Sequence, residues 1–238
     1  PTSHLDARHR IEVMLILRQL THEKGVTVIA SLHDIDLAMK ACDVALLIKD
    51  EHILACGTPE DVLTEEVVTE LYGMDKATFS VFLGGLELKG DKSGKTVFVV
   101  AGAGSGASVY RALTKHGLSV ITGVLPENDI DYHIASAVDA AIIKSTAYNA
   151  ISQNTYLEAL KLLERASQVI DAGFPVGTIN QVNVDLIKWA LDQGKRVHTL
   201  RKQAEAEILY GVNAARLMYS HDFFELMSAV KKINSTPA

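Results

Sequence analysis

Short apolar runs alternate with amphipathic segments along the second half of the chain, and this alternation predicts strands and helices in turn. Helical spacing of apolar residues recurs between the runs, for example at Tyr156, Leu160 and Leu163. Alternation of this kind favours a parallel, doubly wound α/β sheet whose helices form the crossovers. The five predicted strands lie within residues 96–101, 118–125, 140–146, 168–171 and 195–200.

The first 80 residues show a different pattern. Residues 26–32, VTVIASL, are apolar and rich in β-branched side chains, which predicts a buried strand. A short helix follows, and residues 44–50 and 52–57 predict a hairpin that turns at Glu51. The helix after residues 1–6 has Ser3 or Asp6 as its expected N-cap.

These patterns divide the chain into four parts. A Gly-, Lys- and Asp-rich stretch near residue 90 is typical of a linker. We expect a first domain over residues 1–78, a linker over 79–95, a Rossmann-like α/β domain over 96–200 and a helical tail over 201–238.

Composition narrows the class of protein. The chain has 238 residues, 48% of them hydrophobic, and a net charge of −6, so a nucleic-acid partner is not expected. Cys42 and Cys56 have neither metal-site spacing nor the number needed for a disulfide framework. No apolar run reaches about 18 residues, so we expect no membrane-spanning helix.

Two fragments of the first domain are candidates for chemistry: PTSHLD at residues 1–6, and IASLHD, in which His33 follows the predicted strand. Ligands of open α/β sheets sit beyond the carboxyl ends of strands. On spacing alone, a fragment such as the first is more often a helix cap, and a histidine such as His33 is more often a hydrogen-bonded bystander.

The order of these pieces resembles the C-terminal part of an ABC-transporter ATPase subunit. PTSHLD is similar to the end of the Walker B and D-loop segment, and TVIASLHDIDLAMKACDVALLIKDEHILACGTPEDVL to the switch-histidine loop and closing hairpin. HDIDLA and LTEEVVTELYGM are closest to importers of iron–siderophores, haem or cobalamin. Glu51 departs from the glycine usual in the hairpin turn, which puts the turn geometry in doubt.

The resemblance implies roles for single residues. His33 is then the catalytic switch histidine that contacts the γ-phosphate, and Ser3 and Asp6 are D-loop residues that face a second ATPase subunit. It also implies ATP and Mg²⁺ as cofactors of the full-length parent, permease subunits as partners, assembly as a homodimer, and a cytoplasmic position at the inner face of the membrane. No resident metal site is expected in this chain.

The resemblance also implies that the chain is a fragment. The P-loop, the signature motif and the Walker B acids are not in it; Gly94-Lys95-Thr96 has Lys89 where a P-loop needs glycine. We therefore expect that this chain alone does not hydrolyse ATP.

A second candidate site is the glycine-rich turn after the first strand of the second domain. Gly102, Gly104, Ser105 and Gly106 follow a strand and open a helix, the context of a phosphate-binding turn. A tight turn without a ligand and an anionic or nucleotide-like ligand are equally good readings, and nicotinamide redox chemistry is a weaker one.

Three further loops should reach the same sheet edge. Around residue 128 the polar residues could bind a metal or a hydroxyl-rich ligand, or Asn128 or Asp129 could simply cap a helix. Such convergence favours a pocket. The candidate ligand-binding residues of these loops are Glu127, Asn128, Asp129, Thr146, Gly177 and Thr178.

The second domain, from about residue 102 to 196, resembles the extra domain that some cobalamin or iron–siderophore importer ATPases carry, for which no activity is implied. We expect it to sense a small anionic ligand and regulate the ATPase. The alternatives are a nucleotide- or cofactor-dependent enzyme, and a dimerisation module that uses the amphipathic tail.

Overall fold

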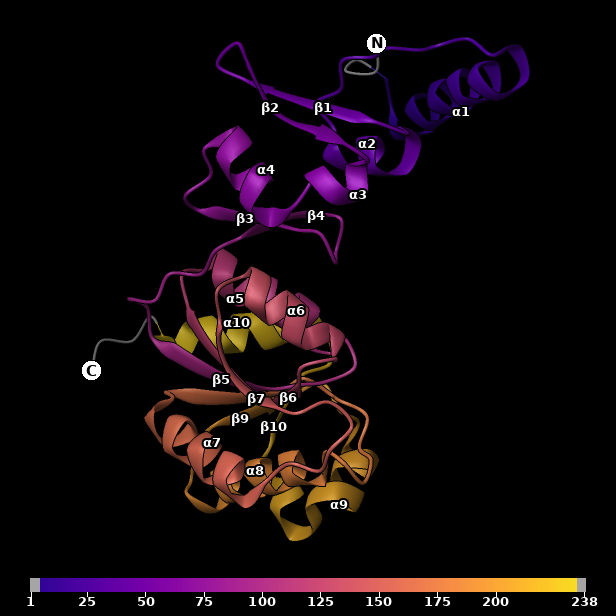
Figure 1. The fold of residues 1–238 in the computed structure, drawn as a ribbon. Helices are drawn as coiled ribbons and strands as arrows, with labels where there is room; N and C mark the ends of the chain where they lie inside the picture. Colours follow the sequence, from indigo (N-terminus) through magenta and orange to yellow (C-terminus); the bar gives the residue numbers. More distant parts are fainter. Residues whose placement is uncertain (1–4, 235–238) are drawn as a thin grey trace. The chain divides into compact units, whose positions relative to one another are not determined.

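The computed structural model describes residues 5–234 and forms two compact units, residues 1–86 and 87–238 (Figure 1). The N-terminal unit is small and contains short elements. In chain order they are α1 (Ala7–Lys24), α2 (Ile35–Ala41), β1 (Ala45–Lys49), β2 (His52–Gly57), α3 (Pro59–Val62), α4 (Glu65–Tyr72) and β3 (Ala77–Ser80). The next strand, β4 (Gly85–Leu88), crosses the boundary and pairs with β3.

The hairpin of the N-terminal unit and the Asp6 cap of α1 are as the sequence predicts. Strands β1 and β2 pair in antiparallel fashion, and Asp50 and Glu51 form the turn with φ of 48° and 65°. A left-handed backbone favours glycine, which explains why glycine is usual in this turn. Glu51 adopts the same conformation here. Asp6 caps α1 by accepting a hydrogen bond from the His9 N–H at 2.9 Å, whereas Ser3 lies outside the described residues.

The prediction of a buried strand at residues 26–32 is wrong. This segment has no regular secondary structure and belongs to no sheet, and Ile29 is 95% exposed. A strand that is buried on both faces needs hydrogen-bonding neighbours at its edges. The described part of the N-terminal unit offers it none, so apolar content alone does not make it a strand.

The N-terminal unit has a small core and a large exposed apolar surface. Its core is formed by Leu47, Leu63, Val68 and Phe79. Several apolar side chains on α1, the segment 26–32 and the hairpin are more than half exposed: Ile11, Leu15, Ile16, Ile29, Val44, Leu46, Ile48 and Ile53.

A six-stranded sheet organises the C-terminal unit, and all five of its strand pairings are parallel. The order β7-β6-β5-β8-β9-β10 is the 3-2-1-4-5-6 order of a doubly wound sheet. The α/β prediction is confirmed, and the sixth strand is one that the sequence pattern did not predict. The strands are β5 (Thr96–Val100), β6 (Ser119–Pro126), β7 (Ala141–Ser145), β8 (Gln168–Asp171), β9 (Val197–Thr199) and β10 (Met218–Tyr219).

Helices cover both faces of this sheet (Figure 1). On one face lie α5 (Ala107–Lys115), α6 (Ile130–Ala137) and α10 (Phe223–Asn234), and on the other α7 (Gln153–Arg165), α8 (Gln181–Asp192) and α9 (Gln203–Tyr210). A 3₁₀ helix, η1 (Gly211–Arg216), links α9 to β10. The residues expected as a tail therefore include a sheet strand, and α10 packs within the unit because Gln168 donates a hydrogen bond to the Val230 carbonyl at 3.0 Å.

Candidate functional site

The loop that carries His33 is held in place by three helices. His33 lies between residues 26–32 and α2, whose first turn Asp34 caps by accepting a hydrogen bond from the Leu37 N–H at 3.1 Å. Asp34 also pairs with Arg10 of α1 at 2.8 Å, and the Tyr72 hydroxyl reaches the His33 carbonyl at 3.5 Å. The loop is thus held by α1, α2 and α4, while the His33 side chain is exposed.

A cavity of about 670 Å³ opens beside this loop, within the N-terminal unit. His33, Arg10, Asp34 and Tyr72 line it. An imidazole and a guanidinium group therefore line the same cavity. Asp6 remains at the α1 N-terminus, where the N–H and imidazole of His9 lower the pKa of its carboxyl.

The glycine-rich turn of the C-terminal unit forms internal hydrogen bonds. The Gly102 N–H donates to Ser105 Oγ at 3.2 Å. The Ala103 N–H donates to both carboxylate oxygens of Asp129, at 3.0 and 2.9 Å, and the Gly106 N–H to both of Asp131, at 3.2 and 3.0 Å. The sequence predicted Asp129 as a ligand-binding residue or as a helix cap; here its carboxylate binds the turn itself.

The two aspartates sit in different surroundings. Asp129 is partly exposed and caps α6 by accepting from the Asp131 N–H at 2.9 Å, as one reading of the sequence predicted. Asp131 is fully buried. Burial raises the pKa of the Asp131 carboxyl, the charge of Asp129 raises it further, and hydrogen bonds from the turn amides partly oppose both effects.

The remaining predicted residues make contacts on their own loops or are exposed. Glu127 pairs with Lys144 at 2.6 Å on the surface, and Asn128 and Thr146 are exposed on their loops. The Gly177 N–H donates to the Asn180 side chain at 2.7 Å, and Thr178 is exposed beside it. Within residues 5–234 no group of three or more acidic, histidine or cysteine side chains is arranged to hold a metal ion, so nothing supports the metal reading of the loop at residue 128.

A buried polar network at the ends of β8 and β9 was not predicted. Asp171 accepts hydrogen bonds from Arg201 Nε at 2.8 Å, Tyr210 at 2.8 Å and Thr199 at 3.1 Å. The Arg201 guanidinium also lies 4.9 Å from the centre of the Phe174 ring. Charged residues at the ends of adjacent apolar strands are the sequence signal that would have pointed to this network.

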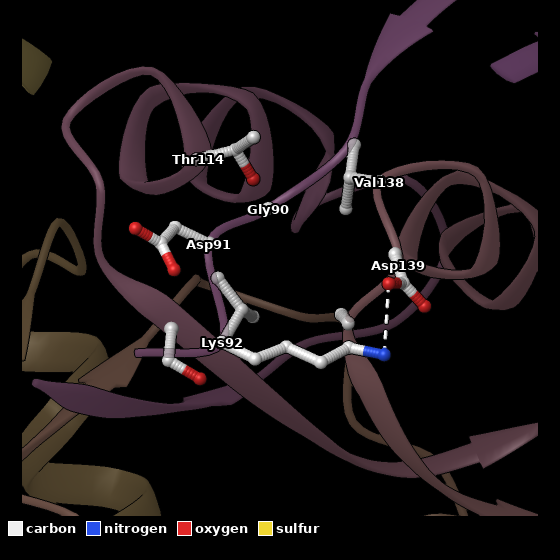
Figure 2. A pocket seen from close by; sticks show the side chains of 9 residues that line it. Gly90, Asp91, Lys92, Thr114, Val138 and Asp139 are labelled. Carbon is white, nitrogen blue, oxygen red and sulfur yellow. Dashed lines mark ion pairs between the residues drawn. The ribbon is translucent and has the colours of Figure 1, made fainter. Parts of the chain in front are cut away.

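A small cavity lies at the other end of the strands, near the residues at which β6 and β7 begin (Figure 2). The segment from Gly90 to Lys92 crosses it, and Lys92 pairs with Asp139 at 2.8 Å. Its volume of about 10 Å³ matches a single water molecule. The Thr114 hydroxyl, which is buried without a partner in the described structure, is the group such a water would satisfy.

Comparisons with known proteins find one matching family model and several relatives. The MJ0874 family matches residues 120–233. An uncharacterized ABC transporter ATP-binding protein of Methanocaldococcus jannaschii, MJ0873, is 44% identical over 126 residues, which cover 52% of this chain and 43% of that protein. The cobalamin import ATP-binding protein BtuD of Halobacterium salinarum is 29% identical over 177 residues, 71% of this chain and 44% of the relative.

A third relative is the hemin import ATP-binding protein HmuV of Escherichia coli O157:H7, 43% identical over 75 residues, which cover 32% of this chain and 29% of HmuV. No solved structure matches. The chain spans less than half the length of these relatives, and the described residues contain no helix long and apolar enough to cross a membrane. The relatives of this chain are thus ATP-binding proteins of ABC transporters.

Proposed function

We propose that this chain is part of the ATP-binding, energy-coupling subunit of an ABC importer of the cobalamin, haem or iron–siderophore class. The observation that carries the proposal is the position of His33, exposed at a cavity and held by α1, α2 and α4. Relatives named for cobalamin and hemin import support the cargo class.

His33 in this proposal contacts the γ-phosphate of ATP and orients the attacking water. Positioning and charge stabilisation dominate the catalysis of phosphoryl transfer, so an exposed imidazole on a fixed loop suits the role. Asp6 and Ser3 face a second ATPase subunit, Mg²⁺ accompanies the nucleotide, and permease subunits hold the protein at the inner face of the membrane. The P-loop that would cradle the phosphates is not in this sequence, so we propose no ATP turnover for the chain alone.

The C-terminal unit serves in this proposal as a regulatory or ligand-sensing domain. A dimerisation module is the second candidate, and one observation favours it. Ile208 of α9 and Val212 of the adjoining η1 are 84% and 91% exposed, and neighbouring exposed apolar side chains are typical of contact surfaces. A nucleotide- or cofactor-dependent enzyme is the third reading, and no observation on the unit favours it.

Purification of the tagged protein from its native membranes tests the importer assignment. The tag is placed at the chromosomal locus and the membranes are dissolved in mild detergent. We expect a complex of permease subunits with two ATPase copies. Recovery of the protein free of any membrane subunit would contradict the assignment.

The dimerisation candidate has a separate test. Light scattering of the purified chain should report a dimer, and Val212→Ser should shift it toward monomer. Tyr148→Ser, which changes a large exposed side chain elsewhere on the unit, is the control and should leave the dimer intact. A monomer at all concentrations would exclude this candidate and leave the importer assignment untouched.

A further inference from the structure

We propose that the glycine-rich turn of the C-terminal unit is a closed structure, in which Asp129 and Asp131 occupy the amides that would otherwise hold a phosphate. The unit then binds no phosphate-bearing ligand at this turn. The prediction of an anionic ligand, drawn from the glycine pattern, stays untested, and the geometry points to the opposite. This inference holds independently of the transport role proposed above.

The turn amides are already in use. In a nucleotide-binding turn, consecutive backbone N–H groups and a helix N-terminus point at phosphate oxygens. Here the N–H groups of Ala103 and Gly106 each reach two carboxylate oxygens, at distances between 2.9 and 3.2 Å. The carboxylates therefore stand in the place of phosphate oxygens.

Electrostatics oppose the entry of a second anion. A phosphate at the turn would face the carboxylates of Asp129 and Asp131, one of them fully buried. Like charges at short range repel strongly where little water screens them. To make room, Asp131 would have to lose its amide partner while staying buried, which is unfavourable for a charged group.

The glycines have structural explanations that need no ligand. A Cβ added at Gly106 would lie 2.5–2.6 Å from the Tyr110 side chain. Gly104 has φ of +86°, a conformation that other residues rarely adopt. The pattern that predicts close approach of a ligand is thus accounted for by the packing of α5 and the path of the chain.

The aspartates have a structural role in place of ligand binding. Asp129 bonds both to the turn before α5 and to the first turn of α6, and Asp131 bonds from within α6 to the N-terminal end of α5. They join the N-terminal ends of two neighbouring helices (Figure 1). The enzyme reading with a nicotinamide dinucleotide therefore lacks a pyrophosphate site at this turn.

Nuclear magnetic resonance of the whole ¹⁵N-labelled chain tests this directly. The backbone amide signals of Ala103 and Gly106 are followed while pyrophosphate, ATP or NAD is added to millimolar concentration. We expect neither signal to move in the wild type. Saturable movement of both signals with any of the three compounds would overturn the proposal.

A pair of variants tests the cause. Asp129→Ala frees the Ala103 N–H and removes one charge, and Asn128→Ala changes the exposed neighbour. Well-dispersed spectra establish that both variants fold. Pyrophosphate should then move the Ala103 signal in Asp129→Ala and leave it in place in Asn128→Ala. Equal lack of response in both variants would show that carboxylate occupancy is not what closes the turn.

Discussion

The side-chain amide of Asn183 hydrogen-bonds to both backbone groups of Val124. Asn183 Oδ1 accepts from the Val124 N–H at 2.9 Å, and Asn183 Nδ2 donates to the Val124 carbonyl at 3.0 Å. Strand β6 shifts register against β7 between Thr122 and Leu125, so the sheet ladder is interrupted here. A buried side chain of α8 thus replaces a strand neighbour.

Replacement of Asn183 by alanine should destabilise the protein by about 2–4 kcal/mol, because two buried backbone groups lose their partners. Chemical denaturation measures the change. Asn213→Ala is the matched control, since Asn213 makes one exposed bond, to Asp192 at 3.0 Å, and should cost under about 1 kcal/mol. Equal losses in the two variants would show that the Val124 bonds contribute little.

The burial of Asp131 should make the free energy of unfolding depend on pH. Its folded pKa is raised, so its stabilising contribution is present in full at low pH and lost as the pH rises through that folded pKa. Asp131→Asn keeps an oxygen that can accept from the Gly106 N–H and carries no charge. We expect its unfolding free energy, relative to wild type, to increase as the pH rises from 4 to 7.

The matched variant Asp131→Ala removes the acceptor as well and should cost about 1–3 kcal/mol at neutral pH. Urea denaturation at several pH values measures both variants. If Asn were as damaging as Ala at pH 7, the hydrogen bond to Gly106 would depend on the negative charge, and the account of the turn would need revision.

His198 should remain neutral well below its usual range. Gln168 donates its amide hydrogen to Val230, so its oxygen accepts from His198 Nε2 at 2.9 Å, which places the imidazole proton on Nε2. His198 Nδ1 is left buried without a partner within residues 5–234. Burial, together with the charge of Arg196, lowers the pKa of His198 to about 4.

Because this folded pKa lies below the unfolded one, the contribution of His198 is present above pH 6.5 and lost as the pH falls through about 4. The loss should be roughly 3 kcal/mol, and it should vanish in His198→Gln. The exposed His221, changed to Gln, is the control. An imidazole ¹⁵N spectrum that shows His198 protonated near pH 6 would refute the assignment.

Gly106→Ala should destabilise the protein by about 1–3 kcal/mol, because the added methyl group meets the Tyr110 side chain at 2.5–2.6 Å. Thermal unfolding measures the effect. Gly85→Ala adds the same methyl group with no atom within 4 Å and should change stability by under about 0.5 kcal/mol. A neutral Gly106→Ala would mean that Tyr110 moves aside readily.

Strands β5 to β9 could be predicted because each is a short apolar run, and helical segments separate the runs along the chain. Strand β10 could not be predicted, because two residues are too few to show an alternation of apolar and polar positions. Residues 26–32 have the composition of a buried strand, yet Ile29 stays exposed because pairing depends on partners elsewhere. Amino-acid composition shows that a segment can form a strand, and hydrogen-bonding partners elsewhere in the chain determine whether it does.

The candidate sites show a similar limit. The glycine pattern at residues 102–106 correctly predicts a turn between a strand and a helix. It says nothing of what the amides bind, because Asp129 and Asp131 lie more than 20 residues further on. Their D-x-D spacing after the next strand is the local signal that would have raised the question.

The central claim, that His33 acts in an ATP-driven importer, is tested most directly by uptake in cells. His33→Ala is introduced at the chromosomal locus, and uptake of labelled cobalamin, haem and ferric siderophore is measured. His52→Ala, an exposed histidine in the hairpin, is the control. The account predicts that uptake of one cargo falls at least about tenfold in His33→Ala only. Unchanged uptake of all three cargoes, with the protein present at its normal level, would contradict it.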